Sequence, residues 1–213
     1  METKYLLYII NCLEFSAAIT ATVYYSKYIF SSEKYFLFFL WYTFFVDLLG
    51  ASLRPMFGMD NYWLYNAFTI TSLLFYFYWY YTILKSHLFR KWVVFFTIVF
   101  SAVAVFSLFY QSWNEYHKYT FVTGALFVLV LTVFHFYKLL NSDEVLIVKY
   151  KLSFWISTAL LLFYMGMIPL MFLTEFLDIS GISYKIIIVS LNLILYGCYI
   201  IGFVWTKKKY NGF

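Results

Sequence analysis

Seven long apolar runs, separated by short polar breaks, account for most of the 213-residue chain and constrain its fold more than any other feature. The runs cover residues 5–26, 35–53, 62–84, 92–110, 119–140, 152–174 and 184–206. Each is close to the ~20 residues that a helix needs to cross the hydrocarbon core of a bilayer. Their continuous apolarity favours helices over the strands of a transmembrane barrel, in which apolar and polar residues alternate.

The breaks between the runs are too short to hold a soluble domain, so consecutive helices are expected to be antiparallel neighbours. The composition agrees, because 64% of the residues are hydrophobic and only 12% are charged. A soluble core cannot bury that much apolar surface, and the excess must face lipid. We therefore expect an all-α integral membrane protein in which residues 1–213 form a single domain, a bundle of seven transmembrane helices.

Positively charged residues are divided unequally between the two sides of this predicted bundle. Four fall on the side of the N-terminus, namely Lys4, Arg54, Lys118 and Lys185. Eleven fall on the side of the C-terminus: Lys27, Lys34, Lys85, Arg90, Lys91, Lys138, Lys149, Lys151, Lys207, Lys208 and Lys209. The positive-inside rule then predicts a cytoplasmic C-terminus and an N-terminus outside the cell. The same distribution explains the net charge of +5 without a nucleic-acid partner.

Aromatic side chains gather near several predicted span ends, most densely at residues 76–81, just before Lys85. Tyrosine and tryptophan are enriched where a membrane helix meets water. We therefore interpret residues 76–81 as part of an interfacial belt, with a ligand-stacking cage as the alternative.

Ionisable residues inside the predicted spans indicate a functional site. A charged side chain in hydrocarbon costs about 2.5–3.5 kcal/mol on insertion scales, and Glu14 and Asp47 both lie within spans. Other polar residues lie at comparable depth or toward the outer surface: Asn11, Asn66, Asn192 and Arg54. We predict that these six residues bind a ligand or a coupling ion in a pocket open to the outside. The alternative is that the two carboxyl groups only fix helix register through hydrogen bonds, while Arg54 snorkels to the surface.

The sixth run contains Gly166 and Pro169, three residues apart. Proline removes one helical hydrogen bond, so this pair predicts a kink or hinge facing a cavity. An accommodated bend without a functional role is the alternative.

Sequence patterns of catalysis are missing from the chain. It has no HExxH motif, no GxSxG motif and no histidine pair at helical spacing. His87 and His117 fall on opposite sides of the membrane, and His135 lies near the cytoplasmic end of its run, so a three-histidine metal site is not expected. A retinal protein would need a lysine near the middle of the seventh run, where this chain has none, because Lys185 lies at the edge of the run. We therefore expect neither an enzyme nor a bound metal or cofactor.

One local pattern carries a family resemblance. The stretch Phe154-Trp155-Ile156-Ser157-Thr158, followed by Leu162-Phe163-Tyr164-Met165-Gly166, resembles the seven-helix modules associated with bacterial sensor histidine kinases. The match covers little more than the sixth run, although the seven-helix plan extends through the chain. The resemblance implies a multi-pass protein of the bacterial inner (plasma) membrane. Because no catalytic extension follows Lys207, it also implies that a signal leaves through a partner.

Three functions remain open at this point. The leading hypothesis is a non-enzymatic sensor or adaptor that receives a small molecule or lipid in its outer half and signals to a cytoplasmic or membrane protein. The second is a small ion- or proton-coupled transporter in which Glu14 or Asp47 binds the coupling ion. The third is a membrane subunit that docks another protein of a larger complex.

Overall fold

The computed structural model describes residues 2–142, 145–176 and 181–211, apart from the side chains of residues 2–7, 54 and 173–176. The described residues form α-helices and short 3₁₀ segments, with no strand among them. The α-helices are α1 (Glu2–Val23), α2 (Phe36–Phe57), α3 (Tyr62–Ile83), α4 (His87–Tyr110), α5 (Lys118–Leu140), α6 (Leu152–Phe176) and α7 (Ile182–Trp205). The 3₁₀ segments are η1 (Tyr25–Lys27), η2 (Ser32–Tyr35), η3 (Val145–Tyr150) and η4 (Lys208–Tyr210). Each predicted run thus corresponds to one helix, with ends shifted by a few residues.

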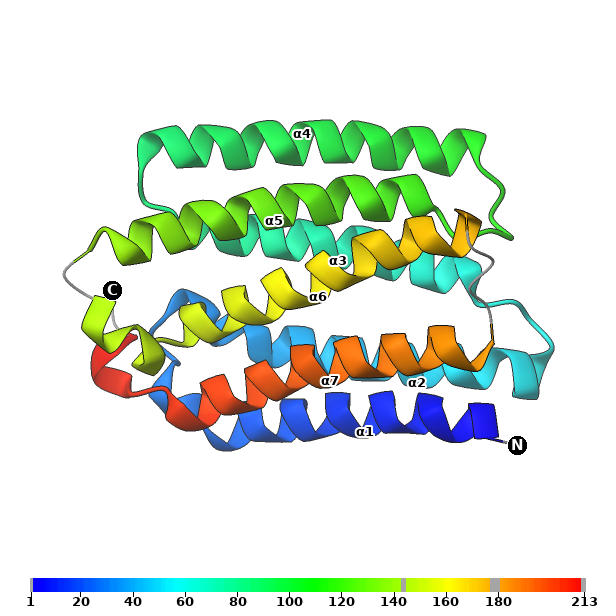
Figure 1. The fold of residues 1–213 in the computed structure, drawn as a ribbon, viewed down its shortest axis with the longest axis horizontal. Coiled ribbons are helices and arrows are strands. Elements are labelled where there is room, and N and C mark those ends of the chain that lie inside the picture. The colour runs from blue at the N-terminus through cyan, green and yellow to red at the C-terminus, as the bar shows by residue number, and fades with distance from the viewer. Residues whose placement is uncertain (1, 143–144, 177–180, 212–213) are drawn as a thin grey trace.

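Consecutive helices run antiparallel along the long axis of the molecule (Figure 1). Helices α1, α2, α3, α5, α6 and α7 pack in sequence around a common interior, and α7 closes the ring by packing on α1. Helix α4 lies outside this ring against α3 and α5. We call the end at which α1 begins the N-terminal end of the bundle, and the end at which α7 finishes the C-terminal end.

Local sequence signals mark several helix ends. The Ser31 side chain accepts a hydrogen bond from the Glu33 backbone N–H at 3.3 Å, which caps the start of η2 just before α2. Gly58 follows α2 and has a positive φ of 65°, a conformation that glycine adopts at little cost. Gly181 has a φ of 78° immediately before α7 begins. These backbone geometries stop one helix and start another within a few residues.

Five described helical stretches are long and apolar enough to cross a membrane, which indicates a multi-pass membrane protein. They are Ser32–Phe57, His87–Tyr110, Lys118–Leu140, Leu152–Phe172 and Ile182–Trp205. A shorter apolar stretch, Tyr8–Val23, belongs to α1. Helix α3 has 22 residues but is richer in tyrosine and polar side chains. Its polar residues Asn66, Thr69 and Ser72 are buried among the neighbouring helices, so the low hydropathy of α3 reflects an interior position.

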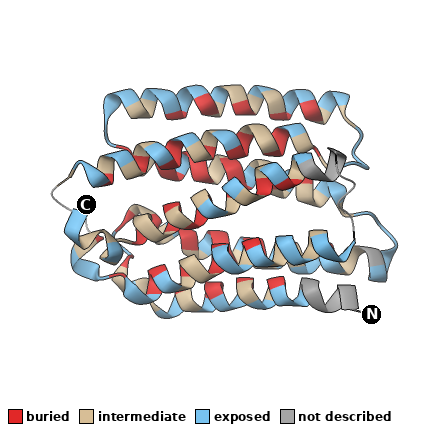
Figure 2. Ribbon diagram, viewed as in Figure 1, coloured by how far each residue is buried: buried red, intermediate tan, exposed pale blue. Residues whose placement is uncertain are grey.

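Burial is one-sided on most of the helices (Figure 2). Helix α4 illustrates this, because Phe96 and Phe100 face α3 and α5 and are buried, whereas Phe95, Ile98 and Phe106 are exposed. In water such an apolar outer surface would cause aggregation, but in lipid it is the solvated surface.

The interior near the C-terminal half of the ring is mainly aromatic. Phe36 is fully buried, and its ring packs edge-on against those of Phe75 and Trp79 at centroid distances of 5.0 and 5.1 Å. Phe39, one turn further along α2, stacks in parallel on Phe75 at 4.3 Å. These contacts join the start of α2 to the second half of α3.

Only some of the aromatic residues at positions 76–81 are exposed. Tyr78 and Tyr81 are exposed, as an interfacial belt requires. Tyr76, Trp79 and Tyr80 are buried inside the bundle, so the belt interpretation is wrong for these three. The helical period of 3.6 residues places them on the inward face of α3, a distinction that aromatic content alone does not reveal.

Helices α6 and α7 approach closely at Gly202. A methyl carbon added there would lie 2.6 Å from Trp155 Cβ, an atom held close to the α6 backbone. We expect Gly202→Ala to destabilise the protein by about 1–3 kcal/mol, because the two helices must separate. Gly197 is the matched control on the same helix, since nothing lies within 4 Å of a carbon added there. Thermal unfolding in detergent should show a lower Tm for Gly202→Ala and an unchanged or higher Tm for Gly197→Ala. Equal Tm values would contradict this packing.

Candidate functional site

A cavity of about 550 Å³ occupies the N-terminal half of the ring. Its wall receives side chains from α1, α2, α3, α5, α6 and α7, together with Asn61 and Tyr116 from the connections. Helix α4 contributes none of the lining residues. The volume falls within the range of about 300–1,000 Å³ that small-molecule sites have in proteins.

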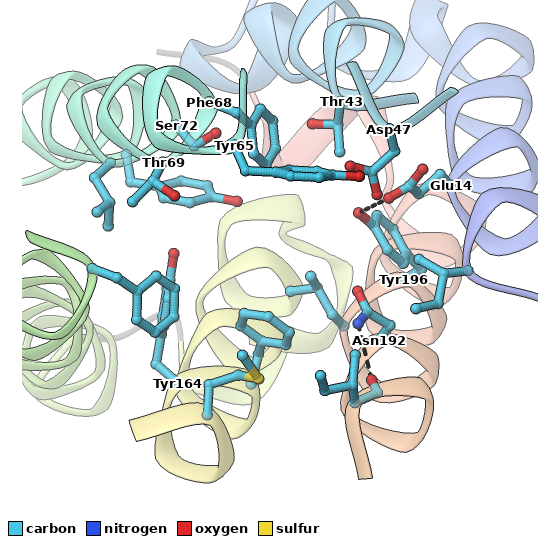
Figure 3. A pocket seen from close by; sticks show the side chains of 18 of the residues that line it. Glu14, Thr43, Asp47, Tyr65, Phe68, Thr69, Ser72, Tyr164, Asn192 and Tyr196 are labelled. Carbon is cyan, nitrogen blue, oxygen red and sulfur yellow. Dashed lines mark hydrogen bonds between the residues drawn. The ribbon is translucent and has the colours of Figure 1, made fainter. Parts of the chain in front are cut away.

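Two carboxyl groups form the most polar part of the wall (Figure 3). Glu14 of α1 is 1% exposed, and Asp47 of α2 is half-buried beside it. Tyr196 of α7 donates a hydrogen bond from its hydroxyl to Glu14 Oε1 at 3.0 Å. Glu14 Oε2 is buried and has no hydrogen-bond partner among the described residues. The Tyr65 ring of α3 extends along the cavity with its hydroxyl toward Asp47.

The chemistry of this acid pair follows from its surroundings. No lysine or arginine is among the described residues that line the cavity. Two ionised carboxylates repel each other strongly where water is largely excluded. The arrangement is therefore stabilised by a proton shared between Glu14 and Asp47, or by a cationic group placed between them.

Most of the remaining wall is apolar, with scattered hydroxyl groups. Phe68, Phe163 and Met167 represent the apolar part. Ser72 Oγ is buried and has no hydrogen-bond partner among the described residues, although Ser72 belongs to the cavity wall. Tyr164 also lines the cavity and is buried. An apolar chamber with a few polar groups at defined places is the usual form of a small-molecule site.

Three of the predicted site residues meet at this cavity. Glu14 and Asp47 do so as described, and Asn192 of α7 lines the same chamber (Figure 3). The Asn192 side-chain amide donates to the Ile188 backbone carbonyl of its own helix at 2.9 Å. Asn11 is half-buried but is not among the lining residues, because Ile10 and Glu14 are the positions at which α1 faces the chamber.

Asn66 was predicted to bind a ligand, but its side chain makes hydrogen bonds to the connection between α4 and α5. Its side-chain amide donates to the Glu115 backbone carbonyl at 2.9 Å, and its Oδ1 accepts from the His117 backbone N–H at 2.9 Å. Asn66 therefore fixes the α4–α5 connection against α3. Between those two anchored residues lies Tyr116, whose hydroxyl hydrogen-bonds to Thr69 at 3.0 Å. Since Tyr116 and Thr69 line the cavity, Asn66 supports the wall from behind.

The remaining predicted residues lie on α2 and α6. The side chain of Arg54 lies outside the described residues. Helix α6 continues as an unbroken α-helix through Gly166 and Pro169, and Pro169 is exposed. Gly166 is the place where the Leu191 side chain of α7 packs against the α6 backbone. This geometry assigns Gly166 a packing role, and a hinge at these two residues stays a prediction.

Tyrosines are the site residues that the sequence interpretation missed. Tyr65, Tyr76, Tyr164, Tyr196 and Tyr199 all line the cavity. A usable signal existed for Tyr196, which follows Asn192 by four residues and so shares its helix face. For the others, tyrosine is common both at membrane interfaces and in cores, so the residue type alone does not identify the site.

Comparison of the chain with protein-family models, with curated proteins and with solved structures finds no match in any of the three. The resemblance to kinase-associated membrane modules therefore stays a prediction, and the function must be argued from the cavity itself.

Proposed function

We propose that this chain is a non-enzymatic membrane sensor that binds a small molecule in the cavity of its N-terminal half. In this proposal all seven helices cross the membrane, with the N-terminus outside and the C-terminus in the cytoplasm of a bacterial cell. The observation that carries it is the acid pair of buried Glu14 and half-buried Asp47 on the wall of a chamber of about 550 Å³. Among the described residues the wall offers these two carboxyl groups no cation, and a carboxylate in such a site is costly unless it is protonated or a ligand pairs with it.

The chamber favours a ligand with a protonated nitrogen and an apolar body. The carboxyl groups of Glu14 and Asp47 would bind the nitrogen, because a hydrogen bond between oppositely charged groups is stronger than one between neutral groups. The rings of Tyr65 and Phe68 would contact the apolar part, and aromatic faces also attract cations.

A route for the signal exists along α1 and α7. These two helices hold Glu14 and Tyr196 and pack on each other over their length. At the C-terminal end, Lys27 donates to the Val204 backbone carbonyl at 2.7 Å. The segment after α7 reaches the start of α6, where Asn211 Oδ1 accepts from the Leu152 backbone N–H at 3.1 Å. A ligand that moves α7 against α1 would therefore displace the C-terminal connections, where a protein partner would dock.

Amine binding tests the proposal. We expect phenethylamine and longer arylalkylamines to raise the Tm of the purified protein in detergent, and alcohols of the same carbon skeleton to have much smaller effects. Glu14→Gln and Asp47→Asn should each weaken amine binding about tenfold or more, because a hydrogen bond to a charged group contributes about 1.5–3 kcal/mol. Asp60→Asn is the matched control, since Asp60 is an exposed acidic residue at the same end. Equal responses to amines and alcohols, or wild-type amine affinity in Glu14→Gln and Asp47→Asn, would contradict the proposal.

A proton-coupled transporter is the second candidate, and a specific observation favours it. Buried hydroxyl groups continue from the cavity toward the C-terminal end of the bundle, as described next.

A further inference from the structure

A buried polar cluster lies between the cavity and the C-terminal end of the ring. It consists of Tyr80 from α3, Thr132 and His135 from α5, and Ser157 from α6, each no more than 3% exposed. The Tyr80 hydroxyl is 2.6 Å from Thr132 Oγ1 and 3.4 Å from Ser157 Oγ. Ser157 Oγ is in turn 2.8 Å from His135 Nδ1. Three helices thus share one connected set of hydrogen bonds.

The cluster opens at His135 into a second cavity of about 320 Å³. This cavity lies at the C-terminal end, and its wall is mainly polar, with Ser31, Ser153 and Asn211 among its residues. Charged residues from several elements line the same cavity as His135: Glu33 of η2, Lys85 after α3, Lys138 of α5 and Lys151 before α6. A proton released by His135 would therefore reach a compartment with a mainly polar wall.

On the other side, hydroxyl groups lead from the acid pair to the floor of the first cavity. Asp47, Tyr65 and Tyr196 face Glu14, and Tyr196 donates to it. The hydroxyls of Tyr76 and Tyr199 are 3.5 Å apart, and both residues line the same chamber. The structure gives no hydrogen bond between the acid pair and Tyr76 or Tyr199 among the described residues, so the proposal below requires water in the chamber to bridge these groups.

One step separates the two sets of groups. Tyr76 and Tyr80 lie four residues apart on α3, which is a rise of about 6 Å along the helix. Within the described part of the chain there is no hydrogen bond between the Tyr76 and Tyr80 hydroxyls, so a bridging water molecule at this step is part of the proposal. The structure thus gives three hydrogen-bonded groups in the interior, Tyr196–Glu14, Tyr76–Tyr199 and Tyr80–Ser157–His135, with two unbridged steps between them.

From this arrangement we propose that protons move between the two cavities along a line formed by Glu14–Asp47, Tyr196, Tyr76–Tyr199, Tyr80, Ser157 and His135. Each hydroxyl oxygen accepts a proton from one neighbour and passes its own hydrogen to the next, so no covalent product forms. His135 accepts at Nδ1 and releases a proton from its other ring nitrogen. Burying a histidine and hydroxyl groups within spanning helices is costly, and chains of such groups are a recurring form of proton relay in membrane proteins. The inference rests on the membrane crossing proposed above but not on the identity of the ligand.

Proton flux into liposomes tests the line. The purified protein is reconstituted into potassium-loaded vesicles that contain a pH-sensitive dye, and valinomycin in low-potassium buffer then makes the interior negative. We expect internal acidification several-fold faster than in protein-free vesicles. Tyr80→Phe should reduce the protein-dependent rate at least fivefold, because only the relaying hydroxyl is lost. Tyr78→Phe, on the exposed face of the same helix, should leave the rate unchanged.

Ser157→Ala is a second variant, and it should also reduce the protein-dependent proton flux. The inference can therefore be tested even if one of the two variants fails to fold. A wild-type rate equal to that of empty vesicles overturns the inference, as does a wild-type rate in either folded variant. Amine binding is measured on the same preparations. Retained binding without flux removes the proton line alone, whereas flux without amine binding removes the ligand proposal alone.

Discussion

Phe36→Ala is expected to destabilise the protein by about 2–4 kcal/mol. Phe36 is fully buried, and its ring contacts Phe75 and Trp79 of α3 and Tyr199 of α7. Truncation leaves a cavity that these rigid rings cannot fill, so their dispersion contacts are lost. The range lies below the 3–5 kcal/mol of Phe→Ala in water-soluble cores, because in lipid the transfer of apolar surface from water contributes little.

Phe38→Ala provides the matched control, since Phe38 belongs to the same helix and is 64% exposed. Unfolding in mixed micelles, followed by tryptophan fluorescence, should show a marked loss of stability for Phe36→Ala and almost none for Phe38→Ala. Similar losses in both variants would mean that α2 does not face the ring as described.

Asn66→Ala should cost about 2–4 kcal/mol and also disturb the cavity. The substitution removes two hydrogen bonds at once and leaves the Glu115 carbonyl and the buried His117 N–H without their side-chain partner. An unsatisfied buried backbone group costs about 1–3 kcal/mol. Tyr116, held between these two residues, would lose its fixed place on the wall, so amine binding should weaken together with stability.

Asn114→Ala is the matched control, because Asn114 is an exposed asparagine in the connection that Asn66 anchors. It should retain both wild-type Tm and wild-type amine affinity. If Asn66→Ala behaved like Asn114→Ala in both measurements, Asn66 would not anchor the connection.

The helices could be predicted from the sequence because a bilayer imposes a severe local rule. Each spanning segment must be long, continuously apolar and internally hydrogen-bonded. These properties can be checked for each segment without knowledge of the tertiary structure. Helix α3 meets it least well, since its polar and aromatic residues are accommodated only by burial against α2, α4 and α5. Its helical form was predicted, but its inward face was not.

For the candidate site, local reasoning identified the carboxyl groups but not their partners. Glu14 and Asp47 stand out because each is an acidic residue in an apolar run. The short connections predict that α1 lies next to α2, but nothing in the sequence places α7 beside α1, which is what brings Tyr196 to Glu14. Asn66 and Asn192 look alike in sequence, yet one anchors a connection and the other lines the cavity.

Residue type and spacing therefore determined which segments become helices and which side chains are too polar for lipid. Both follow from the free energy of placing a single segment in hydrocarbon, which does not depend on the other helices. Tertiary packing decided where each of those side chains lies. Tyr80, Ser157 and His135 come from three helices and are far apart in the chain, so their hydrogen bonds exist only once α3, α5 and α6 have packed. The two acidic residues were visible in the sequence, whereas the arrangement of the helices decided that they meet and that Tyr80, Ser157 and His135 are joined by hydrogen bonds.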